Sequence, residues 1–457
     1  MIRKVKSLLK FKMSKTVAAV CALVLLTGAL GAMLVSCGEK TTEKSVYFLN
    51  FKPEVAEVYN EIAKEYQAET GVKLNVVTAA SNTYEQTLKS EIAKADAPAI
   101  FQINGPKGYA SWKDYCADLK DSKLYGLLSE KSMAITSGDG VYGIPYVVEG
   151  YGIIYNDRIM QAYFTSENKS VDISSVEEIN SFEVLSSVVA DMTKLKDELG
   201  IEGVFASTSL KPGEDWRWTT HLANIPIYYE FKNNNIDLSS DKTREISFTY
   251  ANEYQNIFDL YIHNSLTDPK LLGSRQVADS MAEFALGRCA MVQNGNWAWS
   301  QISGVSGNTV DENDIKFMPI YTGIEGEEAQ GLCIGTENYL AINKTLSEEK
   351  RTLAEDFLYW LFTSDTGKRY VTDKLNFITP FSSFDENEVP DDPLAREVSR
   401  WLKMDDKTSV DWNFTIFPSQ TFKDNFGSAL LSYAQGNLSW NEVRDRVISD
   451  WKTESNA

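Results

Sequence analysis

The chain has 457 residues, 12% of them aromatic, and a formal net charge of −19 at pH 7. This length is enough for two or three domains, and the acidic balance repels nucleic-acid phosphates, so no nucleic acid is expected as a partner. Five widely spaced cysteines and two histidines provide neither a disulfide framework nor a zinc site, and no metal or cofactor is predicted.

Residues 1–36 have the pattern of a secretory signal peptide. Six cations and no acid lie in residues 1–15, and residues 16–36 then run without a charge. The run closes on the small-residue stretch Leu34–Ser36, which Cys37 follows directly. A basic region, an apolar region and a small-residue cleavage site together predict secretion. Removal of this segment with its six cations changes the formal net charge from −19 to −25.

The sequence Leu-Val-Ser before Cys37 resembles the bacterial lipoprotein signal, in which the cysteine thiol is diacylated before cleavage. The resemblance implies a mature protein that begins at Cys37 and is lipid-anchored on the extracytoplasmic face of the cell membrane, with residues 37–44 as a polar tether. The alternative is an uncleaved transmembrane anchor, since 21 uncharged residues are long enough to span a bilayer. The small-residue box favours the lipoprotein.

Strand and helix patterns alternate at the start of the mature chain. The predicted elements are a strand at 46–49, a helix at 53–70, a strand at 72–77, a helix at 84–95 and a strand at 99–103. This order predicts a doubly wound, largely parallel sheet, in which ligands bind beyond the carboxyl ends of the strands. Asn50 and Asn104 occupy such positions and are candidate ligand-binding residues, and helix capping is the alternative role for each.

Residues 142–156 are apolar, punctuated by glycine and nearly uncharged, which is typical of a buried strand. Such a strand suits a crossing between two lobes, and a buried strand inside one domain is the alternative. Helical regions are predicted at 175–199 and 248–263.

The most specific pattern lies at residues 281–300. An amphipathic helix ends at Gly287, a short strand follows at 289–292, and the turn at 294–295 leads into a helix with Trp297 at its N-terminus. The stretch Asn-Gly-x-Trp-Ala-Trp-Ser after a short strand with Ala-Met resembles the maltose-binding branch of the bacterial extracellular solute-binding proteins. In that family the first Trp of the motif stacks on a sugar ring, which implies this role for Trp297.

Three further stretches resemble the same family, and they occur in the family order. One begins at Glu149 and matches a stretch whose glutamate contacts the ligand at the interlobe crossing, which implies that Glu149 binds the ligand. Glu214 and Trp216 fall where the family has an acid and an aromatic residue that line the sugar groove. Residues 339–372 resemble the strand and helix by which the chain returns to the first lobe.

The resemblance implies a two-lobed α/β fold of the periplasmic-binding-protein type, in which each lobe is a sheet flanked by helices and the chain crosses several times. The implied division is 45–148 with 333–381 for lobe 1, and 149–332 with 382–457 for lobe 2. The implied function is that of a monomeric, non-enzymatic binding protein. It would hold a neutral sugar or oligosaccharide in the interlobe cleft and deliver it to the permease subunits of an ABC importer.

The expected ligand contacts depart from the maltose-binding pattern. Gln102-Ile-Asn104-Gly-Pro replaces an aromatic and charged stretch after the third strand. The last stacking Trp of the family falls near Lys423, with Phe422 beside it and Trp412 upstream. Maltose itself is therefore in doubt. A sugar still suits the chain, because aromatic rings stack on its C–H face while Asn, Asp and Glu pair with its hydroxyls.

Two other classes of function stay open on the sequence alone. A surface glycoside hydrolase needs two carboxylates in an aromatic cleft, and Glu149 and Glu214 are candidates for that pair. A solute-binding protein for a peptide or a polyamine suits the negative charge. The sequence also leaves open the identity, linkage and length of the sugar, the type of bacterial envelope, and whether Trp216 or Trp218 faces the ligand.

Overall fold

The computed structural model describes residues 44–80, 83–238, 240–385 and 387–456. The predicted signal peptide, Cys37 and all of the tether except Lys44 lie outside this part of the chain. Within it, no helix combines the length and the apolar character needed to cross a membrane.

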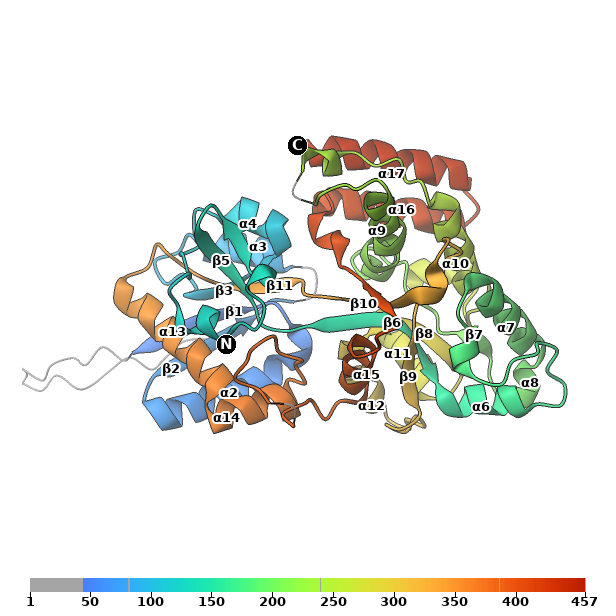
Figure 1. Ribbon diagram of the computed structural model, residues 1–457, viewed down its shortest axis with the longest axis horizontal. Helices are drawn as coiled ribbons and strands as arrows, with labels where there is room; N and C mark the ends of the chain where they lie inside the picture. The colour runs from blue at the N-terminus through green and yellow to red at the C-terminus, as the bar shows by residue number, and fades with distance from the viewer. Residues whose placement is uncertain (1–43, 81–82, 239, 386, 457) are drawn as a thin grey trace, which may run out of the picture. The chain divides into compact units, whose positions relative to one another are not determined.

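A mixed sheet forms the centre of the first lobe (Figure 1). Its strands, in spatial order, are β2 (Lys73–Thr78), β1 (Ser45–Asn50), β3 (Ile100–Asn104), β11 (Asn338–Ile342), β5 (Gly140–Pro145) and β4 (Ile135–Ser137). β1, β2 and β3 are parallel as predicted, whereas β11 pairs antiparallel with both β3 and β5. The parallel prediction is therefore confirmed for the first part of the chain.

Helices cover both faces of the first sheet. One face packs against α2 (Ala56–Thr70) and α13 (Glu348–Thr363), and the other against α3 (Tyr84–Glu91) and α4 (Gly105–Trp112). The helix α2 ends as predicted, because Gly71 adopts a φ of 73° and caps it. The helix α3 stops at Glu91 rather than at residue 95, since the Lys94 N–H bonds to Glu91 O in a turn that leads toward β3. Two shorter α-helices of this lobe are α5 (Lys123–Leu127) and α14 (Asp365–Arg369).

A second mixed sheet forms the centre of the second lobe. Its strands, in spatial order, are β12 (Thr408–Val410), β10 (Gln330–Gly335), β6 (Glu149–Asn156), β8 (Cys289–Gly295) and β7 (Gly203–Phe205), with β9 (Ile315–Met318) also paired to β6. Every residue of β6 and β8 is buried. This explains the uncharged, glycine-punctuated sequence that predicted a buried strand.

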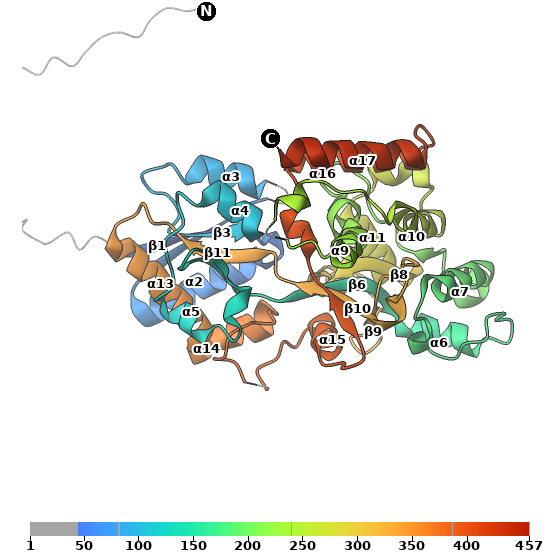
Figure 2. The ribbon, with the colours of Figure 1, turned by 45° about the horizontal axis from the view of Figure 1, so that its top comes forward.

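Helices also cover both faces of the second sheet. The larger core lies under α6 (Asp157–Thr165), α7 (Phe182–Lys194), α9 (Ala223–Asn233), α10 (Ala251–His263), α16 (Gln420–Ala434) and α17 (Trp440–Ser455), with the short α8 (Lys196–Leu199) after α7. The opposite face packs against α11 (Val277–Ala285), α12 (Trp299–Ser303) and α15 (Pro393–Leu402). Figure 2 shows α16 and α17 side by side along one flank of this lobe.

The chain passes between the sheets by short segments. It leaves β5 through residues 146–148 and enters β6 at Glu149, and it returns through residues 336–337 from β10 to β11. The last crossing comes later than expected, because Ser383 Oγ donates to Phe362 O at 2.7 Å and Phe384 packs against the core of the first lobe, although lobe 2 was expected to resume at residue 382. The chain reaches the second lobe at α15. Residues 333–335, which the family resemblance assigned to the first lobe, are part of β10 in the second sheet, where Cys333 pairs with Tyr151 of β6. The return crossing therefore begins after residue 335.

Candidate functional site

Aromatic side chains from separate parts of the second lobe meet in one group, which we call the aromatic cluster. It consists of Trp216, His221, Trp297, Trp412 and Phe414. These residues come from η4 (Arg217–Leu222), η7 (Asn296–Ala298) and η10 (Asn413–Ile416), or from the residue just before the element. The element η4 is a π-helical turn, a form often found at functional sites.

His221 lies at the centre of the aromatic cluster. Its ring stacks on Tyr151 of β6 with 4.2 Å between ring centroids and an interplanar angle of 5°. The ring centroids of Trp216, Phe414 and Trp297 lie 4.7, 5.2 and 5.5 Å from that of His221. Burial lowers the pKa of His221 well below its ordinary value, and the Arg217 and Lys423 charges lower it further. The imidazole is therefore neutral at pH 7.

Two glycines let two of the three tryptophans in the cluster lie against the ends of strands. Trp297 covers Gly295 at the end of β8, and Trp412 covers Gly335 at the end of β10. A Cβ atom on Gly335 would lie 2.6 Å from Cγ of Trp412, and one on Gly295 would overlap the Trp297 indole. Gly295 pairs with Tyr151 in the sheet, and Gly335 pairs with Glu149. The two indoles are thus placed on strands that flank β6.

Gly335→Ala is expected to displace the Trp412 indole and to lower the free energy of unfolding by about 1–3 kcal/mol, the usual cost of an overpacked core. Near-ultraviolet circular dichroism should report the changed indole environment, and urea unfolding should report the lost stability. Gly126→Ala is the matched control, because a Cβ there meets nothing within 4 Å. Equal behaviour of the two variants would show that Gly335 does not position Trp412.

Burial separates Trp218 and Phe422, which belong to the core, from Trp216. Trp218 is 1% exposed and its Nε1 donates to Ser209 O at 2.9 Å, so it belongs to the core. Trp216 is half-buried and joins the aromatic cluster. Phe422, also 1% exposed, packs against Trp451 in the core of the lobe.

A buried ion pair lies where β6 begins. The Lys52 Nζ donates to Glu149 Oε1 at 2.6 Å, and the two residues are 6% and 4% exposed. Glu54 Oε1 lies 3.7 Å from the same ammonium group. Burial opposes the charge of Lys52, but Glu149 and Glu54 outweigh it, so the pKa of Lys52 is raised. Glu149, the predicted ligand contact, is thus tied to a cation that follows β1 of the first lobe.

Asn50 holds the turn that presents Lys52. Its Nδ2 donates to Lys52 O at 2.8 Å and to Thr78 Oγ1 at 3.1 Å, and its Oδ1 accepts from Lys52 N at 3.2 Å. The residue is fully buried. Both ends of the amide that was predicted to contact a ligand are therefore used inside the first lobe.

Asn104 and its neighbours keep unpartnered polar atoms at the crossing from β10 to β11. Asn104 Nδ2 donates to Glu337 Oε1 at 3.0 Å, while Asn104 Oδ1 has no hydrogen-bond partner among the described residues. Asn338 lies opposite Asn104 in the sheet, is 1% exposed, and has no partner in the described chain for either side-chain polar atom. Leaving such groups unpaired costs about 1–3 kcal/mol each, so the arrangement favours a polar ligand here.

Both carboxylate oxygens of Glu214 are bonded to other groups of the protein. Its Oε1 lies 3.0 Å from Lys211 Nζ, and its Oε2 accepts from the Val277 N–H, at the start of α11, at 2.7 Å. Glu214 and Trp216 were both predicted to line the sugar groove. In the structure Trp216 is part of the aromatic cluster, whereas Glu214 stabilises the start of α11.

Lys423 stands near the position of the family's last stacking tryptophan. The carboxylates of Glu337, Glu85 and Asp424 act electrostatically on this half-buried residue of α16, although none of them forms an ion pair with it within 4 Å among the described residues. Burial lowers the pKa of Lys423, and the nearby carboxylates partly restore it. Burial likewise raises the pKa of Glu337, which Lys423 and Asn104 counteract.

The two lobes touch where α4 begins. Gly105 has a φ of 61°, and a Cβ atom on it would lie 2.7 Å from Cβ of Thr415 in η10. The Gly105 N–H donates to Glu337 O at 3.1 Å. Only glycine fits this contact, because both the left-handed backbone and the short distance exclude a side chain.

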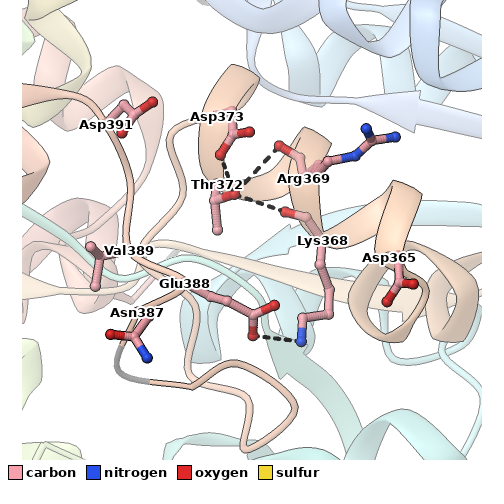
Figure 3. Close-up of a pocket in the computed structure, with 9 residues that line it drawn as sticks. All are labelled: Asp365, Lys368, Arg369, Thr372, Asp373, Asn387, Glu388, Val389 and Asp391. Carbon is pink, nitrogen blue, oxygen red and sulfur yellow. Dashed lines mark hydrogen bonds and ion pairs between the residues drawn. The ribbon is translucent and has the colours of Figure 1, made fainter.

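A surface hollow beside α14 has a different character (Figure 3). Its lining residues are Asp365, Lys368, Arg369, Thr372, Asp373, Asn387, Glu388, Val389 and Asp391, none of them aromatic. Lys368 turns toward Glu388, and Thr372 bonds to the backbone of its own helix. The hollow lacks a ring on which a sugar could stack, and it contains none of the predicted site residues.

The described part of the chain contains no metal-binding group of residues and no disulfide bond. No group of three or more His, Cys, Asp or Glu residues there is arranged to hold a metal ion. Cys116, Cys289 and Cys333 are free and buried.

Sequence reasoning missed several residues of the site. His221 was considered only as a metal ligand, although it lies five residues after Trp216 in an aromatic-rich stretch. Lys52 lies between the end of the first predicted strand and Pro53. This position is close to the carboxyl end of the strand, where a ligand was expected. Glu337 and Asn338 carried no signal beyond their place at the start of a strand.

Comparison with known proteins gives the family and the fold. Residues 61–397 match the profile described as bacterial extracellular solute-binding protein. No protein with a curated description matches the chain.

Several solved structures are similar to the chain over most of its length. A chitin oligosaccharide binding protein has 15% identity and a TM-score of 0.67, covering 90% of this chain and 99% of that protein. The solute-binding protein RafE in complex with raffinose has 16% identity and a TM-score of 0.66, with 90% and 99% covered. Maltose-bound MalE3 of T. maritima has 14% identity and a TM-score of 0.64, with the same coverage.

These structures are two-lobed binding proteins, so the predicted two-lobed α/β fold of the periplasmic-binding-protein type is confirmed. The family comprises binding proteins rather than enzymes. Since the profile match extends over residues 61–397, well over half of the chain, the protein belongs to the bacterial extracellular solute-binding protein family.

Proposed function

We propose that this protein binds a sugar or oligosaccharide between its two lobes and delivers it to the permease subunits of an ABC importer. The observation that carries the proposal is the aromatic cluster, in which half-buried Trp297 and Trp216 lie with ring centroids 6.0 Å apart. Aromatic faces of this kind suit the C–H faces of sugar rings. The similar structures bind raffinose, maltose or chitin oligosaccharides, which supports the same ligand class here.

The proposed ligand contacts come from both lobes. Trp297 and Trp216 supply the stacking surface, and Trp412 lies on the same His221 ring. Asn104 supplies an acceptor without a partner in the described chain, and Glu149 has a second carboxylate oxygen, Oε2, beyond the one bound to Lys52. Lobe 1 is proposed to comprise 45–148 and residues from 336 to about 391, and lobe 2 the remainder of the mature chain.

A thermal-shift screen tests the proposal. The purified mature protein is heated with each member of a panel of mono- and oligosaccharides, a polyamine set and a peptide library. A ligand that binds only the folded state at one hundred times its Kd stabilises it by about 2.7 kcal/mol, which raises the melting temperature. A shift with a polyamine or a peptide, and with no sugar, would overturn the proposal.

The hydrolase alternative is weakened by the partners of its candidate carboxylates. Glu149 is bound to Lys52, and both oxygens of Glu214 are engaged by Lys211 and Val277. Chromatography of the sugar that shifts the melting temperature, after incubation with the protein, separates the two functions. Binding without product supports a transport protein, and released shorter sugars would identify an enzyme.

Anchoring through Cys37 is part of the proposal. Cys37→Ala should abolish acyl labelling and block cleavage after Ser36, because the lipidated thiol is required before the cut. Metabolic labelling with a fatty-acid analogue and mass spectrometry of the N-terminus measure both. A Cys37→Ala protein that is still acylated and cleaved at that bond would contradict the lipoprotein assignment.

A further inference from the structure

Two asparagines face each other where β3 ends and β11 begins, and their amides are not fully bonded. Oδ1 of Asn104, and both Oδ1 and Nδ2 of Asn338, have no hydrogen-bond partner among the described residues. The two residues lie opposite each other in the antiparallel pair of β3 with β11. Opposite side chains of such a pair have Cβ atoms about 4.5–5.5 Å apart, so one bound group can reach both amides. Asn338 is 1% exposed, so bulk water does not satisfy it.

Other buried amides at the same edge of the sheet are bonded within the protein. Gln102 of β3 donates from Nε2 to Tyr146 Oη, and its Oε1 accepts from the Phe51 N–H. Asn50, at the end of β1, likewise uses both ends of its amide. The two opposed asparagines are therefore an exception at this edge. A buried amide that is kept without partners favours a ligand that supplies them.

Direct contacts place the two asparagines beside the aromatic cluster. Gly105, the residue after Asn104, lies against η10, where a Cβ atom on it would be 2.7 Å from Cβ of Thr415. The Thr415 hydroxyl donates to Trp412 O at 3.2 Å. The Trp412 indole in turn covers Gly335, three residues before β11 begins. The two amides of the first lobe thus adjoin the cluster of the second lobe across the contact between them.

The unpartnered atoms decide which chemical group fits between the two amides. They comprise two acceptors, Oδ1 of Asn104 and Oδ1 of Asn338, and one amide nitrogen that donates. Exchange of O and N in the Asn338 amide leaves the same set. Two neighbouring hydroxyls satisfy all three atoms, because each hydroxyl both donates and accepts. A carboxylate or a sulfate has no proton for either acceptor, and an acetamido group has one N–H and so donates to only one of them.

We infer that Asn338, together with Asn104, recognises two adjacent free hydroxyl groups of the bound sugar. Asn338 is then a specificity-determining residue of the first lobe. The inference rests on the proposed sugar-binding function and narrows its ligand class to sugars that present an unsubstituted pair of neighbouring hydroxyls. An acidic or N-acetyl substituent on either carbon removes one of the two hydroxyls that the amides require.

The first test removes the hydroxyls of the sugar one at a time. The mature protein is screened by calorimetric titration against a panel of neutral sugars that includes raffinose, maltotriose, xylotriose and chitotriose. The monodeoxy derivatives of the sugar that binds most tightly, one for each hydroxyl, are then titrated. Two derivatives, modified at adjacent carbons of one ring, are expected to bind roughly tenfold to a hundredfold more weakly, because each leaves a buried amide atom unpaired.

Asn338→Leu connects that loss to one residue. This variant should bind the intact sugar about as weakly as the parent binds one of the two derivatives, and removal of that same hydroxyl should then have no further effect. Such a cycle of protein and ligand changes isolates the contact between the two groups. Asn60→Leu is the matched control, since it makes the same change at an exposed position of α2 in the same lobe and should keep the parent's pattern.

A second measurement needs no sugar. Asn338→Leu removes buried polar atoms that have no partner within the described chain, so the melting temperature of the unliganded protein should stay unchanged or rise. Gln102→Met is the comparison, because it deprives Tyr146 and Phe51 of their partner and should lower the melting temperature. Equal losses in the two variants would show that the protein itself uses the Asn338 amide, and would overturn its assignment.

The contrary outcomes separate this inference from the proposed function. Monodeoxy derivatives that all bind like the intact sugar would show that water fills the place between the amides, and would overturn the inference. Two affected hydroxyls that are not adjacent, or a pattern that persists unchanged in Asn338→Leu, would overturn it as well. In each of these cases sugar binding stands. Failure of every sugar in the panel to bind would overturn the proposed function, and the inference with it.

Discussion

Trp297→Ala is expected to weaken binding of the cognate sugar by roughly tenfold to a hundredfold, which corresponds to about 1–3 kcal/mol for a truncated aromatic anchor. The indole is half-buried at the edge of the aromatic cluster, where its ring centroid lies 5.5 Å from that of His221. The fold should persist, because Trp297 packs against the core from its margin and is not enclosed by it. Calorimetric titration with the sugar found in the screen measures the change.

The matched control is Trp360→Ala. This tryptophan is also half-buried, but it lies on α13 of the first lobe, where its Nε1 donates to Glu69 at 2.8 Å. Its removal should leave the sugar affinity unchanged. If the two variants bind alike, Trp297 is a packing residue and the stacking assignment is wrong.

Glu149→Gln is expected to lower the free energy of unfolding by about 3–5 kcal/mol, the usual cost of leaving a buried charge without its partner. The Lys52 ammonium, now 2.6 Å from Glu149 Oε1, would keep only Glu54 at 3.7 Å. The double variant Lys52→Met/Glu149→Gln removes both charges and should recover most of the loss. Urea unfolding of the parent, both single variants and the double variant gives the coupling energy directly.

An exposed pair provides the comparison. Lys94 and Glu91 lie 2.7 Å apart, but the Lys94 side chain is 50% exposed, so Lys94→Met should cost at most about 1 kcal/mol. A loss in Glu149→Gln no larger than in Lys94→Met would mean that water reaches the Lys52–Glu149 pair. The pair would then not hold the start of β6 to the first lobe.

Elements defined by local sequence were predictable. Pro53 and Gly71 bracket a helical pattern, and the helix ends where the glycine adopts its left-handed conformation. The stretch around Trp297 was also correct in outline, with a buried strand followed by a short helical turn. These features depend on neighbours a few residues away, and such neighbours are visible in the sequence.

Pairings between distant residues were not predictable. Lys52 and Glu149 are 97 residues apart, and Asn104 and Glu337 are 233 apart. The first contact depends on how the two sheets are placed against each other, and the second depends on the pairing of β3 with β11. No local pattern encodes either. Glu149 was therefore identified as important without its partner, and His221 was not identified at all.

Two predicted site residues illustrate a different limit. Asn50 and Glu214 have the residue types that a sugar site requires, and both stand at the predicted positions. Each uses its polar atoms on the protein, Asn50 in a turn and Glu214 at the start of a helix. A side chain that bonds to a ligand and one that bonds to a nearby backbone group look the same in a sequence, because the choice depends on a rotamer.

The contact between Gly105 and Thr415 has a consequence for the motion of the lobes. On one side this contact consists of backbone alone, so parting the lobes there uncovers almost no hydrocarbon, which would otherwise cost about 25 cal/mol per Å². We therefore expect this contact to contribute little to the free-energy difference between open and closed arrangements. Each 1.4 kcal/mol by which a ligand prefers the closed arrangement then changes the ratio of the two about tenfold. At this point, the lobes can then part to release the ligand without first separating a large apolar contact.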